Sequence, residues 1–135
     1  MTAISHPTHG PIGGQSLRSS VVAAAALAVH FSVVAGLVPL GVTPLMANVA
    51  AFLAALIVGV VGHHRWTLRA RAQRRGAVLR RFVLVAVAGF VVNEINYAAL
   101  LTDTAIDYRA ALLLVLTAVA ALTSVVARDW VFADA

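Results

Sequence analysis

The feature that most constrains this sequence is a pair of apolar runs that occurs twice along the chain. Residues 19–38 and 45–62 form the first pair, and residues 82–101 and 110–127 form the second. At about 1.5 Å per helical residue, each run is about 27–30 Å long, which matches the hydrocarbon core of a bilayer. The runs are continuous and rich in Ala, Leu and Val, whereas strands of a membrane barrel alternate. The sequence therefore predicts an all-α, polytopic membrane bundle of four transmembrane helices, built from two tandem helical hairpins.

The composition is that of a small membrane protein with one compact domain. Hydrophobic residues make up 61% of the 135 residues and charged residues only 11%, which lies far from the range of soluble proteins. We expect residues 18–135 to form the four-helix domain. Residues 1–17, which are rich in Pro, Gly, Ser and Thr, read as a flexible cytoplasmic tail. A cleaved signal peptide is an alternative for the first run, but its length and its place in the repeat favour a retained anchor.

The distribution of arginine predicts the orientation in the membrane. All ten basic residues are Arg, and seven of them lie between residues 65 and 81, in the one long internal loop. The other connections, 39–44 and 102–109, are short and hold at most one Arg. The positive-inside rule therefore places both termini and the 63–81 loop in the cytoplasm. The net charge of +5 is explained by this topology signal and by anionic headgroups, so no nucleic-acid partner is expected.

Each hairpin ends in a basic–aromatic step. Residues 63–68 read His-His-Arg-Trp-Thr-Leu, and residues 128–132 read Arg-Asp-Trp-Val-Phe; a shift of 64 residues aligns Trp66 with Trp130. Because each repeated unit has an even number of spans, both steps lie on the same side of the membrane. One interpretation is an aromatic belt with snorkelling Arg side chains at the interface. The other is a lipid-phosphate site, in which Arg donates to phosphate oxygens and Trp covers the prenyl chain.

The third apolar run contains polar residues at hydrocarbon depth. Glu94 lies 13 residues after Arg81, about 20 Å into the core, where an ionisable group costs roughly 2.5–3.5 kcal/mol. His30 reaches a comparable depth in the first run. The group is either a structural cluster, with Glu94 bound to His30 or to an Asn, or a polar lining for a sugar headgroup or for protons. Its predicted members are His30, Asn93, Glu94, Asn96 and Tyr97, with Asn48 as a weaker candidate.

No constellation for catalysis or metal binding stands out in the sequence. A Gly-rich phosphate loop, metal-ligand His and Cys spacing and a Ser-His-Asp arrangement are all missing. There is no cysteine, so neither disulfide nor thiolate chemistry is available. We therefore expect no enzymatic activity, no catalytic residue, no cofactor and no metal.

The order of these motifs resembles the GtrA-like family of small four-span membrane proteins, over residues 18–132. The resemblance lies in residues 65–67 after the second span, 80–82 at the start of the third and 128–132 after the fourth. The family usually has Asn-Arg-any-Trp-Thr-Phe after the second span; here His63 and His64 replace the Asn and the first Arg. Leu68 replaces the Phe, and Ala127 stands where the second copy commonly has Asn. The positions that carry over are Arg65, Trp66, Thr67, Arg128 and Trp130.

The resemblance implies a role in the synthesis of cell-surface polysaccharides. Members are linked to moving polyprenyl-phosphate-linked monosaccharides across the cytoplasmic membrane, or to assisting the glycosyltransferases that use them. We therefore expect a flippase of the bacterial cytoplasmic membrane, with a polyprenyl-phosphate-linked sugar and membrane lipids as its partners. Four short helices enclose little volume, so a homo-oligomer or a groove open to lipid is expected.

Two alternative functions stay open. The first is a membrane adaptor that recruits a membrane glycosyltransferase through the 63–81 loop. The second is a small proton-coupled exporter similar to the small multidrug resistance family. That family has its essential Glu in the first span, whereas Glu94 lies in the third, so this alternative ranks last.

Overall fold

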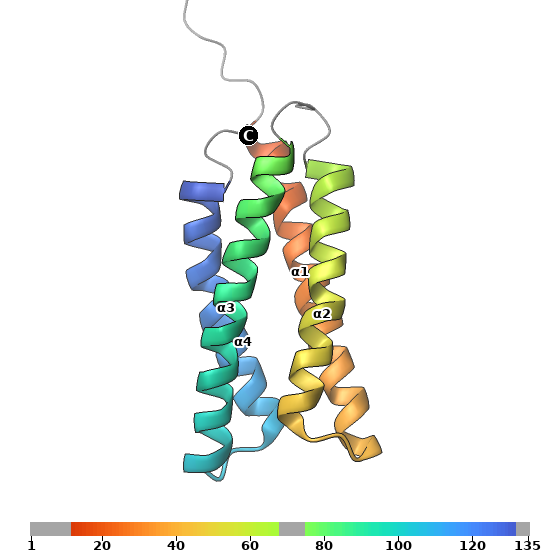
Figure 1. The fold of residues 1–135 in the computed structure, drawn as a ribbon, viewed down its shortest axis with the longest axis vertical. Helices are drawn as coiled ribbons and strands as arrows, with labels where there is room; N and C mark the ends of the chain where they lie inside the picture. The colour runs from red at the N-terminus through yellow and green to blue at the C-terminus, as the bar shows by residue number, and fades with distance from the viewer. Residues whose placement is uncertain (1–11, 68–74, 132–135) are drawn as a thin grey trace, which may run out of the picture.

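In the computed structural model, the chain forms four long helices that lie side by side along the long axis of the molecule (Figure 1). The structure describes residues 12–67 and 75–131, without the side chains of residues 12–16, 67, 75 and 128. Each long helix is apolar enough and long enough to cross a membrane. The predicted all-α membrane bundle is thus confirmed. The helices are α1 (Ile12–Leu37), α2 (Pro44–Gly62), α3 (Arg75–Asp103) and α4 (Tyr108–Val126).

Two of the helices begin earlier than the apolar runs. Helix α1 starts at Ile12 and so includes the last part of the predicted tail, while residues 1–11 lie outside the described residues. Helix α3 starts at Arg75, so Arg80 and Arg81 belong to the helix instead of preceding it. Arg is a good helix former, so a helix can continue through basic residues beyond the hydrocarbon core. Residues 68–74 of the predicted loop lie outside the described residues.

Proline, glycine and threonine shape the turn of the first hairpin, at the place the sequence predicts. A short 3-10 helix, η1 (Val38–Leu40), is followed by Gly41 with φ of 94°, a conformation that costs Gly little because it lacks a Cβ. Thr43 then caps α2, since its hydroxyl oxygen accepts a hydrogen bond from the backbone N–H of Met46 at 3.5 Å. Pro44 takes the first helical position, where its missing N–H costs nothing.

A carboxylate cap starts the last helix. The side chain of Asp107 accepts a hydrogen bond from the backbone N–H of Arg109 at 2.9 Å, directly before α4. This contact satisfies one of the unpaired N–H groups at the helix start. Asp107 is thus the N-cap of α4.

The four helices close into a ring of two hairpins. α1 packs on α2, and α3 packs on α4; between the hairpins α2 meets α3, and α1 meets α4 in the smallest of these contacts. Helices α2 and α4 therefore occupy diagonal positions, and both end at the same end of the bundle (Figure 1). We call this the basic end, because α3 begins there with its Arg residues. We call the opposite end, which holds the two hairpin turns, the outer end.

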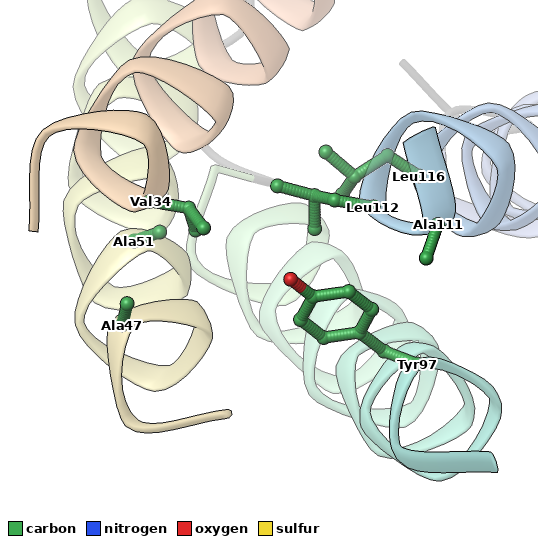
Figure 2. Close-up of a cluster of buried hydrophobic side chains, with 7 residues drawn as sticks. All are labelled: Val34, Ala47, Ala51, Tyr97, Ala111, Leu112 and Leu116. Atoms are coloured by element: carbon green, nitrogen blue, oxygen red, sulfur yellow. The ribbon is translucent and has the colours of Figure 1, made fainter. Parts of the chain in front are cut away.

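An apolar core fills the outer part of the bundle. Figure 2 shows the ring of Tyr97 between the alanines of α2 and the leucines of α4. Ala47 and Ala51 are fully buried, and such small side chains allow helices to approach closely in a membrane. The buried members of this core are Val34, Ala47, Ala51, Tyr97, Ala111, Leu112 and Leu116.

Candidate functional site

Asn48 joins three helices through hydrogen bonds inside the bundle. Its Oδ1 atom lies 2.6 Å from His30 Nε2, while its Nδ2 donates to Asn93 Oδ1 at 2.8 Å and to Glu94 Oε2 at 2.5 Å. Both amide hydrogens of Asn48 are therefore used. Its oxygen can only accept, so His30 donates and carries a proton on Nε2. We call His30, Asn48, Asn93 and Glu94 the polar cluster; the first three are buried and Glu94 is partly exposed.

The polar cluster connects the two hairpins. His30 and Asn48 come from α1 and α2, and the other two members come from α3. Glu94 is bound to an asparagine, and both it and His30 meet Asn48 instead of each other. Hydrogen bonds between membrane helices contribute about 0.6 kcal/mol on average and up to about 1.7 kcal/mol. The cluster thus stabilises the contact between the hairpins.

One polar atom of the cluster lacks a partner among the described residues. Asn93 Nδ2 is buried and forms no hydrogen bond, although Asn93 Oδ1 is bound to Asn48. Leaving a buried donor unsatisfied costs about 1–3 kcal/mol, and no bulk water is present in the hydrocarbon to satisfy it. Asn93 also lines a cavity, described below. The cluster therefore offers a hydrogen-bond donor to an acceptor bound in the bundle.

Two residues that the sequence assigned to this group lie elsewhere. Asn96 is exposed, and its Nδ2 donates to the backbone oxygen of Val92 in its own helix at 2.7 Å. Tyr97 is fully buried in the outer core, and its hydroxyl donates to the backbone oxygen of Tyr108 at 3.2 Å. A helical wheel gives the angles between side chains on one helix. It does not say where the neighbouring helices lie, so it could not separate these two residues from the polar cluster.

A cavity of about 230 Å³ lies between the four helices, from the polar cluster to the basic end. His30 and Asn93 line one end of it, and His63 lines the other. Most of the remaining lining is apolar and includes Phe52 and Phe90, whose rings stack with centroids 4.2 Å apart. The sequence-based expectations did not include this cavity. Its only sign in the sequence is small residues on the facing sides of the helices: Ala55, Gly59, Ala86, Gly89 and Ala120.

Both hairpins end in a π-helical turn. The first is η2 (His63–Thr67) and the second is η4 (Ala127–Val131), so the two turns are related by the same shift of 64 residues that aligns Trp66 with Trp130. Turns of this kind are rare and occur frequently at functional sites. Trp66 and Trp130 are each 47% exposed, next to the ends of α2 and α4 at the basic end (Figure 1). We call η2 the first corner and η4 the second corner.

The first corner presents its polar side chains outward. His64 and Arg65 are exposed, and Arg65 forms no hydrogen bond or ion pair with the described residues. The predicted role of the Thr67 side chain falls outside the described side chains. His63 is buried beneath His64 and Arg65, with its ring edge-on to Phe82 at 4.8 Å between centroids. The two neighbouring histidines thus point in different directions. This corner combines an accessible guanidinium with an accessible indole.

The second corner is held by a side chain of α3. The guanidinium of Arg81 donates to the backbone oxygen of Trp130 at 3.3 Å and lies over its ring, 5.6 Å from the centroid. Val131 is buried against Val78 beside this contact. The predicted role of the Arg128 side chain falls outside the described residues. The two corners are therefore alike in backbone but different in their side-chain contacts.

These features define a small, four-span helical membrane protein with duplicated basic–aromatic corners at one end of the bundle. The family described as GtrA/DPMS, transmembrane domain, matches residues 18–132, and the chain belongs to this family. No curated protein and no solved structure matches the chain significantly. Membership in this family indicates a role in handling sugars on glycosyl-carrier lipids. Among the described residues, no group of three or more His, Cys, Asp or Glu side chains could hold a metal ion.

Proposed function

We propose that this protein translocates a polyprenyl-phosphate-linked monosaccharide across the cytoplasmic membrane, for the synthesis of cell-surface polysaccharide. The observation that carries the proposal is the polar cluster, which includes the unpaired donor Asn93 Nδ2. Polar and ionisable side chains at membrane depth are costly, and they commonly mark the path of a substrate. In this proposal the protein binds and moves its lipid without enzymatic activity.

The lipid phosphate binds at the basic end, on the predicted cytoplasmic side. Arg65 is exposed at the first corner with no described partner, so its guanidinium is available to phosphate oxygens. Trp66 lies at headgroup depth beside it, and Thr67, whose side chain lies outside the described ones, is the third predicted member of this phosphate site. Neighbouring helix axes lie about 9 Å apart, so diagonal helices lie about 13 Å apart. A phosphate group therefore engages one corner at a time, with Arg128 and Trp130 serving the same role at the second corner.

The sugar exchanges hydrogen bonds with the polar cluster as it crosses. Asn93 Nδ2 donates to a hydroxyl oxygen, and the partly exposed carboxylate of Glu94 accepts from a sugar hydroxyl. Exchange of this kind replaces the hydration that the sugar loses on leaving water, since an uncompensated hydroxyl in an apolar medium costs about 2–7 kcal/mol. When His30 releases its hydrogen bond to Asn48, its Nε2–H can donate a hydrogen bond to the sugar instead.

The test is transfer of a polyprenyl-phosphate-linked monosaccharide across reconstituted vesicles. We expect the double substitution Arg65→Ala and Arg128→Ala to abolish transfer, because each corner then loses its own arginine. The guanidinium of Arg81, which stays at the second corner, is already engaged with Trp130. The matched control is Arg109→Ala, which removes one exposed charge at the outer end. Undiminished transfer by the double variant would refute this mechanism.

The second candidate is a membrane adaptor that recruits a glycosyltransferase through the 63–81 loop. It is favoured by the way in which Asn48 satisfies both His30 and Glu94, because such a cluster can serve stability alone. The adaptor predicts that co-purification with the enzyme survives Glu94→Gln and fails when the loop arginines are neutralised. The translocase predicts that Glu94→Gln reduces transfer while leaving any such complex intact.

A further inference from the structure

The cavity opens toward the lipid between α1 and α4. Among its lining residues, only Ala23 and Leu27 of α1 and Ser124 of α4 are exposed. Every lining residue from α2 and α3 is buried or half-buried. The contact between α1 and α4 is also the smallest in the ring. The opening therefore lies at this seam, where it faces the hydrocarbon core instead of water.

The lining of the cavity suits hydrocarbon better than sugar. Polar side chains occur at its two ends and beside its opening, whereas the wall between them consists of alanine, glycine, valine, leucine and phenylalanine. The stacked rings of Phe52 and Phe90 form part of this wall. Sugar hydroxyls held there would lose their hydrogen bonds to water without replacement. An apolar cavity of about 150 Å³ stays dry and accepts benzene, so one of about 230 Å³ accepts a larger, branched hydrocarbon segment.

The cavity continues to the first corner and not to the second. His63 belongs to the π-helical turn η2 and also lines the cavity, two residues before Arg65. No described side chain of η4 lines it. A lipid whose phosphate lies on Arg65 therefore has the start of its chain next to the cavity. The first corner and the apolar cavity are thus joined through His63.

We propose that the cavity binds the first isoprene units of the polyprenyl chain, which enter between α1 and α4 while the phosphate rests on the first corner. The lipid is thus held by its chain as well as by its headgroup, and only the distal part of the chain stays in the bilayer. The identity of this lipid rests on the proposed function. The cavity, its lateral opening and its connection to one corner do not depend on it.

The test is photolabelling by a polyprenyl phosphate that carries a diazirine in its first isoprene units, in vesicles of phosphatidylglycerol. We expect label on the parts of α1 and α4 that line the cavity. Ala120→Leu and Ala86→Leu fill the cavity from α4 and α3, and each should reduce labelling about tenfold through the loss of contacts worth about two methylene groups. The matched controls Ala121→Leu and Ala88→Leu lie on the exposed faces of the same helices and should leave labelling unchanged.

Competition identifies the occupant. Unlabelled polyprenyl phosphate should displace the probe, whereas more phosphatidylglycerol should not. Equal displacement by phosphatidylglycerol would reveal a general acyl-chain site and overturn the proposal, as would label that neither filling variant reduces. The thermal unfolding midpoint of each filling variant shows whether it folds, and the two variants act from different helices. Labelling in the cavity without sugar-lipid transfer refutes the proposed function alone, and transfer without cavity labelling refutes this inference alone.

Discussion

Asn48 forms hydrogen bonds to two other helices, although it lies only four residues after the start of α2. It accepts from one helix and donates to two residues of another. The amide of Asn48 turns its NH₂ group toward the oxygens of Asn93 and Glu94 on α3 and its own oxygen toward His30. The orientation of this one amide thus sets the direction of the hydrogen bonds in the polar cluster.

At the residue scale, we predict that Asn48→Leu lowers the free energy of unfolding by about 1–3 kcal/mol, because His30 and Glu94 lose their partner inside the bundle. The comparison is Asn96→Leu, which removes an exposed amide bound only to its own helix and should change stability by less than about 0.5 kcal/mol. Reversible unfolding in bicelles measures both. Equal effects of the two substitutions would show that the cluster does not stabilise the bundle.

Part of the candidate site was predictable at this scale and part was not. Glu94, Asn93 and His30 were recognisable because burying a polar side chain in an apolar span costs free energy. Such side chains therefore tend to form hydrogen bonds with one another. Asn96 and Tyr97 lie only partly on the same face of α3 as Asn93 and Glu94. Packing against the neighbouring helices determines that Tyr97 points inward and Asn96 outward. Which side points inward depends on how the two hairpins pack together, and the periodicity of a single helix gives no information about that packing.

At the scale of the elements, the two π-helical turns show that the duplication extends beyond hydropathy. They occupy equivalent positions in the two hairpins and contain Trp66 and Trp130. The sequence shows the basic–aromatic steps but gives no sign of the backbone that carries them. The structure also shows that the two corners differ in their contacts. Arg81 of α3 forms a hydrogen bond and a cation–π contact with Trp130, whereas among the described residues no side chain of α1 forms such contacts with Trp66.

We predict that Arg81→Ala loosens the second corner only. The substitution removes a hydrogen bond and a cation–π contact worth about 0.5–1 kcal/mol at an exposed site. In a Trp66→Phe background, the fluorescence of Trp130 should then become more accessible to a soluble quencher. In a Trp130→Phe background, the same substitution should leave the quenching of Trp66 unchanged. An equal change in both backgrounds would contradict the asymmetry of the corners.

Close packing within the first hairpin depends on a glycine near the end of α2. A Cβ atom at Gly62 would lie 2.7 Å from Val22 Cγ1, whereas a Cβ at Gly36 would meet nothing within 4 Å. We predict that Gly62→Ala destabilises the protein by about 1–3 kcal/mol, as overpacking does. Gly36→Ala should instead gain up to about 1 kcal/mol from helix propensity. Unfolding in bicelles distinguishes the two, and a stable Gly62→Ala variant would mean that α1 and α2 separate easily.

At the scale of the whole molecule, the fold was largely predictable. Four apolar runs, the turn residues Gly41 and Pro44 and the cap Asp107 specify two hairpins, because each uses local chemistry that the sequence displays directly. The early starts of α1 and α3 were not predictable from hydropathy, since helices extend past the hydrocarbon. The cavity was not predictable either, because its shape depends on how four helices pack together.

The absence of cysteine allows a direct test of the arrangement in the membrane. We predict that single cysteines at Trp66 and at Asp129 react with a membrane-impermeant maleimide from the same side, the cytoplasmic one. Cysteines at Leu40 and at Ile106, in the two hairpin turns, should react only from the other side. Reaction of positions 66 and 129 from opposite sides would overturn both the topology and the lipid-phosphate sites.

The uneven ring of contacts has a consequence for the membrane itself. The two hairpins contact each other at two interfaces, α2 against α3 and α1 against α4. The second of these is the least extensive contact in the ring. A cargo admitted sideways through that edge keeps its hydrocarbon in the bilayer and needs no water-filled pore along the axis of the bundle. In the proposed translocation, the apolar core around Tyr97 can then stay closed to ions, so that the electrochemical gradient of the cell is preserved while a sugar crosses.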